Sequence, residues 1–345
     1  TPLHGAGYKP VTSILAEAGF TNVFVVQEQK DPDPAFSTVA SPNPEERSAL
    51  KMAIDLAESV KADLVVATDP DGDRTGLAVR DPENGYVILS GNQIGLLLMD
   101  HILSAKEKAG VLSPSSFVVT TIVSSNLTRR IAERYGVRLF EVLTGFKFIG
   151  EVIKKYDEEG DMSFEFGYEE SFGYLAGKDV RDKDAVVAVM LIAEMAASAR
   201  SRGMTLHDVL SELYEKYGYA AEKTISITIE GKEGIERIRN AMNTLRMTKP
   251  PRIGNVMIET ISDYFESHTI DNRTGEVTDL EFEKSNVLLY SLGGDDWFCV
   301  RPSGTEPKLK IYFGIYGQRG EDRSVCEKKL ADVSFLIEKH IRGIL

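Results

Sequence analysis

The sequence predicts an α/β protein of several domains that ends in an α+β domain. Between residues 11 and 198, apolar stripes with helical spacing alternate with short apolar runs that are typical of strands. From about residue 219 the pattern changes to strands and one closing helix. A length of 345 residues is sufficient for about two or three domains that each bury a core. We therefore expect domains over residues 1–89, 90–218 and 219–345.

The first predicted domain starts with a helix over residues 11–18, which is followed by a buried strand over residues 23–26. The next helix is expected to begin with Asn43 as its capping residue and Pro44 in its first position, since both residue types favour these places. The apolar run over residues 62–67 then predicts a second buried strand. This order is that of a β-α-β unit.

The same two periodicities predict the remaining elements. Asn84 and Gly85 indicate a hairpin turn before a strand over residues 86–89. In the second domain we expect helices over 94–105, 127–135 and 184–198 and strands over 117–122, 138–142 and 162–166. The last of these helices is apolar on nearly all sides, which indicates burial. In the third domain we expect a helix from Ser324 and strands over 223–229, 287–290, 297–301 and 310–316.

Composition narrows the classes of function. A formal net charge of −13 disfavours binding to the phosphate backbone of nucleic acids. The two cysteines, Cys299 and Cys326, form no C-x-x-C pair, which is typical of a reducing cytoplasm. The longest apolar run, over residues 185–193, is too short to cross a bilayer. We therefore expect a cytoplasmic protein, monomer or dimer, that binds neither nucleic acid nor a membrane.

The stretch DPDGDR places three carboxylates at alternate positions, Asp69, Asp71 and Asp73, directly after a predicted strand. Like charges this close are tolerated when a cation lies among them. Three oxygen ligands on a turn suit Mg²⁺, and ligands bind at the carboxyl ends of strands in open α/β sheets. An EF-hand is excluded because its glycine and glutamate positions hold Arg74 and Arg80. A solvated acidic turn is the alternative.

Two further stretches carry polar groups that suit a sugar phosphate. RPSGTEPK, over residues 301–308, offers an arginine, hydroxyls and a glycine between two predicted strands, a composition that can surround a phosphate. GYEESFG offers Glu169 and Ser171 to sugar hydroxyls. An ordinary polar hairpin and a capped turn are the alternatives. In RDKD, Lys183 is unusual because a cation gains nothing at the start of a helix.

Together these motifs resemble the α-D-phosphohexomutase superfamily over essentially the whole chain, and most closely its bacterial-type phosphoglucomutases and their phosphopentomutase relatives. The resemblance implies two α/β sandwich-type domains followed by a smaller α+β domain. It implies that Asp69, Asp71 and Asp73 are magnesium ligands, that Arg74 faces a phosphate and that Lys183 is an acid/base group. It assigns substrate binding to three loops, TGFKFIG, GYEESFG and RPSGTEPK, through Thr144, Gly145, Lys147, Glu169, Ser171, Arg301, Ser303, Gly304 and Thr305.

One departure from the family concerns the nucleophile. The phosphate-carrying serine of the family lies in a T-A-S-H-N-P-like loop, which this sequence lacks. The stretch SPNP at Ser41 is similar but has no histidine, and a helix cap explains it better. The opening TPLHGAG resembles the start of the family's second domain. We therefore expect domains two to four of the family without the first, and no turnover by this chain alone.

The resemblance implies a phosphoglucomutase reaction, in which glucose 1-phosphate and glucose 6-phosphate interconvert through a phosphoserine and a bisphosphate. Mg²⁺ and glucose 1,6-bisphosphate are the implied cofactors, and a hexose or pentose monophosphate is the implied partner. Phosphomannomutase and phosphopentomutase activities are alternatives within the family. An aspartyl-phosphate phosphatase and a non-catalytic sugar-phosphate-binding module are alternatives from other classes.

Overall fold

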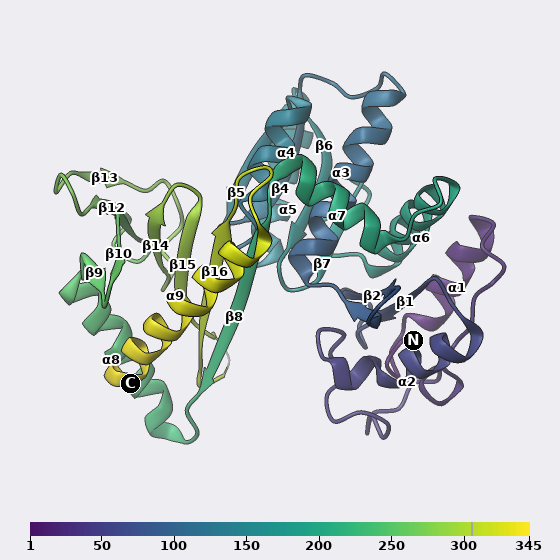
Figure 1. Ribbon diagram of the computed structural model, residues 1–345, viewed down its shortest axis with the longest axis horizontal. Helices are drawn as coiled ribbons and strands as arrows, with labels where there is room; N and C mark the ends of the chain where they lie inside the picture. Colours follow the sequence, from purple (N-terminus) through teal and green to yellow (C-terminus); the bar gives the residue numbers. More distant parts are fainter. Residues whose placement is uncertain (305) are drawn as a thin grey trace. The chain divides into compact units, whose positions relative to one another are not determined.

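The computed structural model describes residues 1–304 and 306–345, with the side chains of all of these except Lys232. Thr305, a predicted substrate-binding residue, therefore lies outside the described residues. The chain divides into two compact units (Figure 1). The first comprises Thr1–Ser124 and Thr128–Leu213, and the second comprises Ser125–Leu127 and Tyr214–Leu345. The division into three domains at the predicted boundaries stays a prediction.

The N-terminal part of the first unit contains α1 (Tyr8–Glu17), η1 (Gln27–Gln29), α2 (Arg47–Val60), β1 (Leu64–Thr68), β2 (Thr75–Asp81) and β3 (Gly85–Ile88). The strands form an antiparallel sheet in the order β1-β2-β3, so β1 lies at an edge. The apolar side of α2, which includes Leu50 and Ile54, packs against Val65 and Ala67 of β1. The predicted hairpin turn before β3 is confirmed, and Gly85 takes a φ of 74° that glycine adopts without strain.

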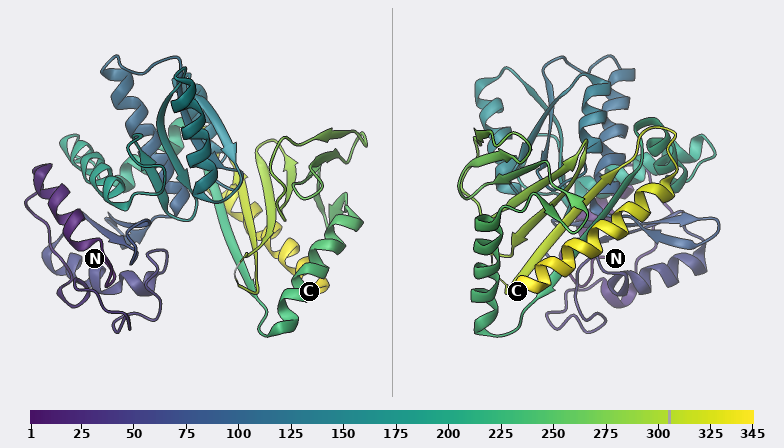
Figure 2. Two further views of the ribbon diagram at one scale, coloured as in Figure 1. Left: turned by 180° about the vertical axis from the view of Figure 1, so that it is seen from behind. Right: turned by 60° about the vertical axis from the view of Figure 1, so that its left-hand side comes forward.

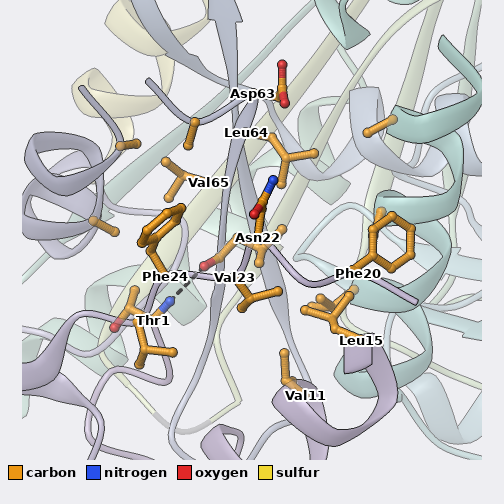
Figure 3. A pocket seen from close by; sticks show the side chains of 18 of the residues that line it. Thr1, Val11, Leu15, Phe20, Asn22, Val23, Phe24, Asp63, Leu64 and Val65 are labelled. Carbon is orange, nitrogen blue, oxygen red and sulfur yellow. Dashed lines mark hydrogen bonds between the residues drawn. The ribbon is translucent and has the colours of Figure 1, made fainter. Parts of the chain in front are cut away.

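The strand predicted over residues 23–26 is wrong. This segment is extended but pairs with no strand among the described residues, and Val23 and Phe24 are 39% and 57% exposed. A strand needs a hydrogen-bonded neighbour, and a cavity lies between this segment and β1 (Figure 3). The predicted β-α-β unit therefore lacks its first strand.

The predicted start of the second helix is also wrong. The helix begins at Arg47, with Glu46 rather than Asn43 in the capping position. Asn43 instead closes the turn that precedes the helix, because its Oδ1 accepts a hydrogen bond from the backbone amide of Glu45 at 3.1 Å. Asparagine favours such turns as strongly as it favours helix caps, so composition did not separate the two.

The chain continues with α3 (Gly91–Lys108), β4 (Ser116–Thr121), α4 (Leu127–Tyr135), β5 (Arg138–Val142), α5 (Phe146–Glu159), β6 (Ser163–Glu169), β7 (Gly173–Ala176), α6 (Ala185–Ser201) and α7 (Leu206–Tyr217). The sheet order is β5-β4-β6-β7, in which β4 runs parallel to β5 and β6 and β7 runs antiparallel to β6. On one face, Ile149 and Ile153 of α5 pack on Phe117. α3 lies so close to β6 that a Cβ on Gly95 would be 2.4 Å from the ring of Tyr168.

Two predicted loops are shorter than expected. TGFKFIG is a loop only at Thr144 and Gly145, because α5 begins at Phe146 and places Lys147 in its first turn. The apolar spacing of α5 explains this helix. Glu169 is the last residue of β6 rather than part of the loop that follows it.

The prediction that the helix over residues 184–198 is buried holds for one side only. Ala188, Val189 and Ile192 of α6 are buried, whereas Ala197 is exposed and Ala193 is only partly covered. The helix begins at Ala185 rather than at residue 184, and the side chain of Asp184 caps it by accepting hydrogen bonds from the amides of the first helical turn.

The second unit has a sheet with the order β13-β12-β11-β14-β15-β16-β8 and antiparallel pairing. Its elements are β8 (Ala220–Thr228), α8 (Lys232–Thr248), β11 (Thr260–Asp263), β12 (His268–Asp271), β13 (Val277–Asp279), β14 (Leu288–Gly293), β15 (Asp296–Pro302), β16 (Lys308–Tyr316) and α9 (Arg323–Ile344), with the short pair β9 (Arg252–Ile253) and β10 (Val256–Met257). The helices α8 and α9 lie on one face of this sheet (Figure 2). Their apolar residues, such as Met242 and Ile337, pack with those of the strands in one core. The α+β prediction for this region is confirmed.

Candidate functional site

The carboxylate loop connects β1 to β2. Gly72 takes a φ of 75°, and its amide donates to the carbonyl of Asp69 at 3.1 Å, which closes the turn. Asp69 is completely buried, Asp73 is half-buried and Asp71 is exposed. One oxygen from each carboxylate lies within 4.8 Å of the others. The turn therefore gathers the three predicted ligands in one place.

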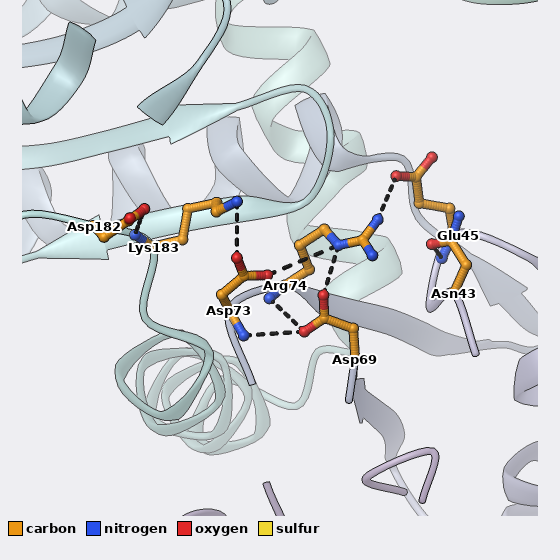
Figure 4. A network of polar contacts seen from close by, with 7 residues as sticks. All are labelled: Asn43, Glu45, Asp69, Asp73, Arg74, Asp182 and Lys183. Atoms are coloured by element: carbon orange, nitrogen blue, oxygen red, sulfur yellow. Dashed lines mark hydrogen bonds and ion pairs between the residues drawn. The ribbon is translucent and has the colours of Figure 1, made fainter. Parts of the chain in front are cut away.

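Asp69 organises the loop through hydrogen bonds (Figure 4). Its Oδ1 accepts from the backbone amides of Asp73 at 3.0 Å and Arg74 at 2.9 Å, and its Oδ2 accepts from Arg74 Nε at 2.7 Å. Burial raises the pKa of Asp69, but the hydrogen bonds from Arg74 and Asp73 outweigh burial and hold the pKa below its ordinary value. Asp69 therefore stays ionised while it fixes the direction of Arg74.

Lys183 forms an ion pair with Asp73 in the same network, with 2.9 Å between Nζ and Oδ2 (Figure 4). Burial and the nearby Asp69 raise the pKa of Asp73, although the hydrogen bond from Lys183 opposes them. Burial acts to lower the pKa of Lys183, but the contact with Asp73 overcomes this and raises it. Lys183 is therefore a cation directly beside the carboxylate loop.

The three carboxylates fit a hard divalent cation. Carboxylate oxygens are the protein ligands that Mg²⁺ takes, and a small number of them leaves coordination places for water or phosphate oxygens. Among the described residues, Asp71 has no hydrogen-bond or ion-pair partner, so its oxygens are available to an ion. Asp73 is held by Lys183 and Asp69 by Arg74, and both retain free lone-pair directions.

Glu169 ends β6, and the loop that follows it, with Ser171, joins β6 to β7 and lies against the carboxylate loop. Glu169 pairs with Gly173 across the two strands, and Gly173 in turn forms a β-bridge with Arg74. The amide of Thr75 donates to the carbonyl of Phe172 at 3.0 Å. These backbone bonds bring the predicted sugar-binding loop and the predicted metal loop together within the first unit.

Glu169 also holds the predicted loop that precedes α5. Its Oε1 accepts a hydrogen bond of 2.6 Å from the amide of Gly145, which has a φ of 123° that strongly favours glycine. Thr144 is therefore held beside Glu169, and Ser171 is partly exposed next to it. Lys147 is exposed and lies over the ring of Phe148, with 4.4 Å between Nζ and the ring centroid.

Gly173 explains how Lys183 reaches this place. A Cβ on Gly173 would lie 2.4 Å from Cδ of Lys183, so the lysine stem passes directly over the glycine. The amide of Ala185 donates to the carbonyl of Gly72 at 3.3 Å, which ties the start of α6 to the carboxylate loop. Lys183 is thus placed by its backbone as well as by its charge.

The predicted phosphate loop connects β15 to β16 in the second unit. The amide of Ser303 donates to the carbonyl of Lys308 at 2.8 Å, and the amide of Glu306 donates to Oγ of Ser303 at 3.4 Å. Apart from Gly304 itself and its chain neighbours, no heavy atom of the described residues lies within 4 Å of the place where a Cβ of Gly304 would stand. Arg301 is partly exposed beside this open loop.

Sequence reasoning missed two charged residues at these sites. Glu45 forms an ion pair with Arg74, with 3.5 Å between its Oε1 and Nη1 of the arginine. It was not considered because the stretch around it was interpreted as a helix cap. Lys310 lies directly opposite Arg301 in the β15–β16 ladder. Like charges in direct register destabilise a sheet unless an anion lies between them, so this pair strengthens the phosphate interpretation. The sequence did contain a signal for this pair. Lys308 and Lys310 are two residues apart at the start of β16 and therefore share a face, and Arg301 ends the preceding predicted strand.

Comparison with known proteins agrees with this arrangement. The family description "Phosphoglucomutase/phosphomannomutase, alpha/beta/alpha domain II" matches residues 1–85, and the corresponding domain III matches residues 90–217. A phosphoglucomutase of Staphylococcus epidermidis is 38% identical over 315 residues, which cover 91% of this chain and 56% of the relative. A phosphoglucomutase of Staphylococcus haemolyticus is 38% identical over 317 residues, with the same shares covered. The chain thus spans about half the length of the curated relatives it matches.

Solved structures share the fold at low sequence identity. The open form of pp63/parafusin, a phosphoglucomutase from Paramecium, matches with a TM-score of 0.64 at 17% identity. The match covers 99% of this chain and 57% of the chain of that structure. A phosphoglucomutase/phosphomannomutase family protein from Burkholderia thailandensis matches with a TM-score of 0.62 at 16% identity. That match covers 99% of this chain and 59% of the chain of that structure.

The matched domains place this chain among the proteins that share domains II and III of the phosphoglucomutase/phosphomannomutase family. The chain belongs to the α-D-phosphohexomutase superfamily, a family of isomerases of carbohydrate metabolism. In the described part of the chain, every helix is too short or too polar to cross a membrane.

Proposed function

We propose that this chain carries the magnesium, sugar and phosphate sites of a phosphoglucomutase, which interconverts glucose 1-phosphate and glucose 6-phosphate. The observation that carries the proposal is the network in which the carboxylate loop, Lys183 and the loop with Glu169 meet. Phosphoglucomutase relatives at 38% identity support glucose phosphates over mannose or pentose phosphates. Glucose 1,6-bisphosphate is the intermediate that such a reaction requires.

Each charged group of the site has a separate proposed role. A cation held by Asp69, Asp71 and Asp73 would neutralise the charge that develops on a transferring phosphoryl group. Arg74 presents its guanidinium beside this loop and suits a phosphate oxygen. Lys183 is placed to exchange a proton with a sugar hydroxyl that Glu169 and Ser171 hold. Arg301 and Lys310 would bind the phosphate that is not reacting.

Two readings from other classes are less well supported. An aspartyl-phosphate phosphatase would use an aspartate of the D-x-D loop as its nucleophile, and it would not need a separate phosphate loop such as the one beside Arg301. A non-catalytic sugar-phosphate-binding module describes the expected behaviour of this chain alone, because its sequence lacks the serine loop of the family. We propose that the 345 residues bind ligands without turnover and act in the cytoplasm.

Calorimetric titration tests the proposal. Glucose 1-phosphate, mannose 1-phosphate, glucosamine 1-phosphate and ribose 1-phosphate are titrated into the chain with Mg²⁺ and without it. We expect glucose 1-phosphate to bind most tightly. Tighter binding of another sugar phosphate would reassign the substrate, and no binding of any of them would refute the proposal.

A further inference from the structure

A strained turn lies beside the carboxylate loop, and the proposed function does not use it. Leu3 and His4, in the stretch TPLHGAG, have φ angles of 45° and 63°. Residues other than glycine rarely adopt this left-handed conformation, because the Cβ atom then crowds the backbone, and here two of them follow one another. Strain of this kind persists only where the surrounding structure holds it, and it is concentrated at functional sites.

The strained turn contacts the carboxylate loop through its backbone. The amide of Ala6 donates to the carbonyl of Pro70 at 2.8 Å. A Cβ on Gly5 would lie 2.2 Å from Cα of Pro70, so the two backbones pack against each other without room for a side chain. Pro70 stands between Asp69 and Asp71, two of the three candidate metal ligands. The turn therefore limits where the backbone between these two carboxylates can lie.

The side chains of both strained residues are held in place. Leu3 is completely buried in the core that α2 and β1 share. His4 is only 5% exposed, and both of its ring nitrogens lie at hydrogen-bond distance from a polar group. Nδ1 is 3.3 Å from the carbonyl oxygen of Asp31, and Nε2 is 2.7 Å from Oγ1 of Thr38. An apolar contact and a polar network thus fix successive residues of the turn.

The donors and acceptors around His4 assign its hydrogen bonds. A carbonyl oxygen can only accept, so Nδ1 donates to Asp31. Oγ1 of Thr38 accepts from the side-chain amide of Gln29 at 2.9 Å, which leaves its hydroxyl hydrogen to Nε2 of His4. The side chain at position 4 therefore supplies one donor and one acceptor to a buried polar network.

The backbone of His4 is bonded to the same segment that carries these partners. Its amide donates to the carbonyl of Gln29 at 2.9 Å, and its carbonyl accepts from the amide of Asp33 at 3.3 Å. Segment 29–38 therefore holds His4 through both the backbone and the ring. A continuous chain of contacts runs from this segment through His4 and Gly5 to Pro70.

We propose that His4 is a positioning residue for the carboxylate loop: its ring locks the strained turn, and the turn holds Pro70 so that Asp69 and Asp71 keep the spacing that a divalent cation needs. This inference rests on the proposed metal site. Mg²⁺ demands near-ideal octahedral geometry, so a small displacement of a ligand lowers its affinity. Without the ring, the turn relaxes towards ordinary backbone angles, and its contact with Pro70 is lost.

Variants of the full chain test this inference. His4→Ala removes both ring hydrogen bonds, and Thr38→Val removes the hydroxyl group that donates to the ring. His4→Gln is the conservative variant, because its side-chain amide again offers a donor and an acceptor. The control is Ile153→Val, which lowers stability through a separate apolar core of the same unit.

Two quantities are measured for each protein. Hydrogen exchange of the Ala6, Gly72 and Asp73 amides, all of which are bonded within or to the carboxylate loop, is followed without metal. Mg²⁺ binding is measured by calorimetric titration. The exchange rates report on the position of the loop whether or not a cation binds there.

We expect His4→Ala and Thr38→Val to speed exchange of the Ala6 amide by about tenfold, the effect of one lost hydrogen bond. Both should weaken Mg²⁺ binding by about tenfold, as does the loss of other groups that orient metal ligands. His4→Gln should restore most of both properties, and Ile153→Val should change neither.

Unchanged exchange in His4→Ala would overturn the inference, and so would faster exchange without weaker Mg²⁺ binding. An equal effect of Ile153→Val would also overturn it, because a general loss of stability would then be sufficient. If the parent chain bound no Mg²⁺, the proposed function would be refuted. The exchange rates alone would then decide whether His4 positions the loop.

Discussion

Asp71 and Asp69 have different roles in the carboxylate loop, although the sequence makes them look equivalent. Asp71 is exposed and has no polar partner among the described residues, whereas Asp69 is buried and accepts from Asp73 and Arg74. We therefore predict that Asp71→Asn weakens Mg²⁺ binding by about tenfold or more while the free energy of unfolding stays unchanged. Calorimetric titration with Mg²⁺ and urea unfolding measure the two effects. Unchanged Mg²⁺ affinity would reject Asp71 as a ligand.

Asp69→Asn is the matched comparison. The side-chain amide of asparagine keeps one accepting oxygen but places an NH2 group at the position of the other, so either Arg74 Nε or the backbone amides of Asp73 and Arg74 lose their acceptor. This substitution should lower the free energy of unfolding by about 1 to 3 kcal/mol in the absence of any metal. If Asp69→Asn and Asp71→Asn were equally stable, the hydrogen bonds of Asp69 would contribute little to the loop.

Arg301 allows a prediction about substrate rather than metal. Its guanidinium lies beside an open loop and opposite Lys310, an arrangement that suits a phosphate. Arg301→Ala should weaken glucose 1-phosphate binding by about 1.5 to 3 kcal/mol, the usual scale of a charge-assisted contact, and should not change the weak binding of glucose. Titration of both ligands into both proteins checks this. Equal affinity of mutant and parent for glucose 1-phosphate would place the phosphate site elsewhere.

At the scale of elements, Gly95 shows how α3 packs on the sheet. A Cβ at this position would lie 2.4 Å from the ring of Tyr168, which is buried. Gly95→Ala should therefore destabilise the protein by about 1 to 3 kcal/mol through overpacking, despite the better helix propensity of alanine. The control is Gly343→Ala in α9, where a Cβ would have no described atom within 4 Å apart from its chain neighbours and the backbone of its own helix, and it should cause no loss. Urea unfolding compares them, and equal stability of the two variants would contradict this packing.

Local sequence signals predicted the elements that depend on their own residues. The helix over 127–135 and the strand over 138–142 match α4 and β5 at both ends. The strand over 23–26 was wrong because strand formation depends on a partner, and no periodicity within a segment reports whether a partner is present. α5 was missed because Gly145 and Lys147 suggested a loop, although Phe146, Ile149 and Ile153 have helical spacing.

At the scale of the whole molecule, the sequence identified the motifs of the site but not how they contact one another. The spacing of three aspartates sufficed to predict the carboxylate loop, because the three carboxylates lie within five residues of one chain segment. The ion pair of Asp73 with Lys183 and the β-bridge of Arg74 with Gly173 join segments about a hundred residues apart. Such contacts follow from tertiary packing, which residue types alone do not specify.

The last prediction concerns catalysis by the whole chain. Phosphoryl transfer in a phosphoglucomutase needs a phosphoserine opposite the metal, and loss of a covalent nucleophile typically lowers the rate by several orders of magnitude. We therefore expect the 345-residue chain to bind Mg²⁺ and glucose 1-phosphate but not to form glucose 6-phosphate. A coupled assay of glucose 6-phosphate formation, with an intact phosphoglucomutase as positive control, measures this.

The same assay on Ser41→Ala separates the two sources of a nucleophile. Ser41 lies in the SPNP stretch, the part of this sequence that most resembles the serine loop of the family. If the chain is inactive, Ser41→Ala should bind Mg²⁺ and glucose 1-phosphate as the parent does, because a serine outside the site has no role in either. Turnover by the chain near the rate of the intact enzyme, lost on Ser41→Ala, would instead make Ser41 the phosphate carrier.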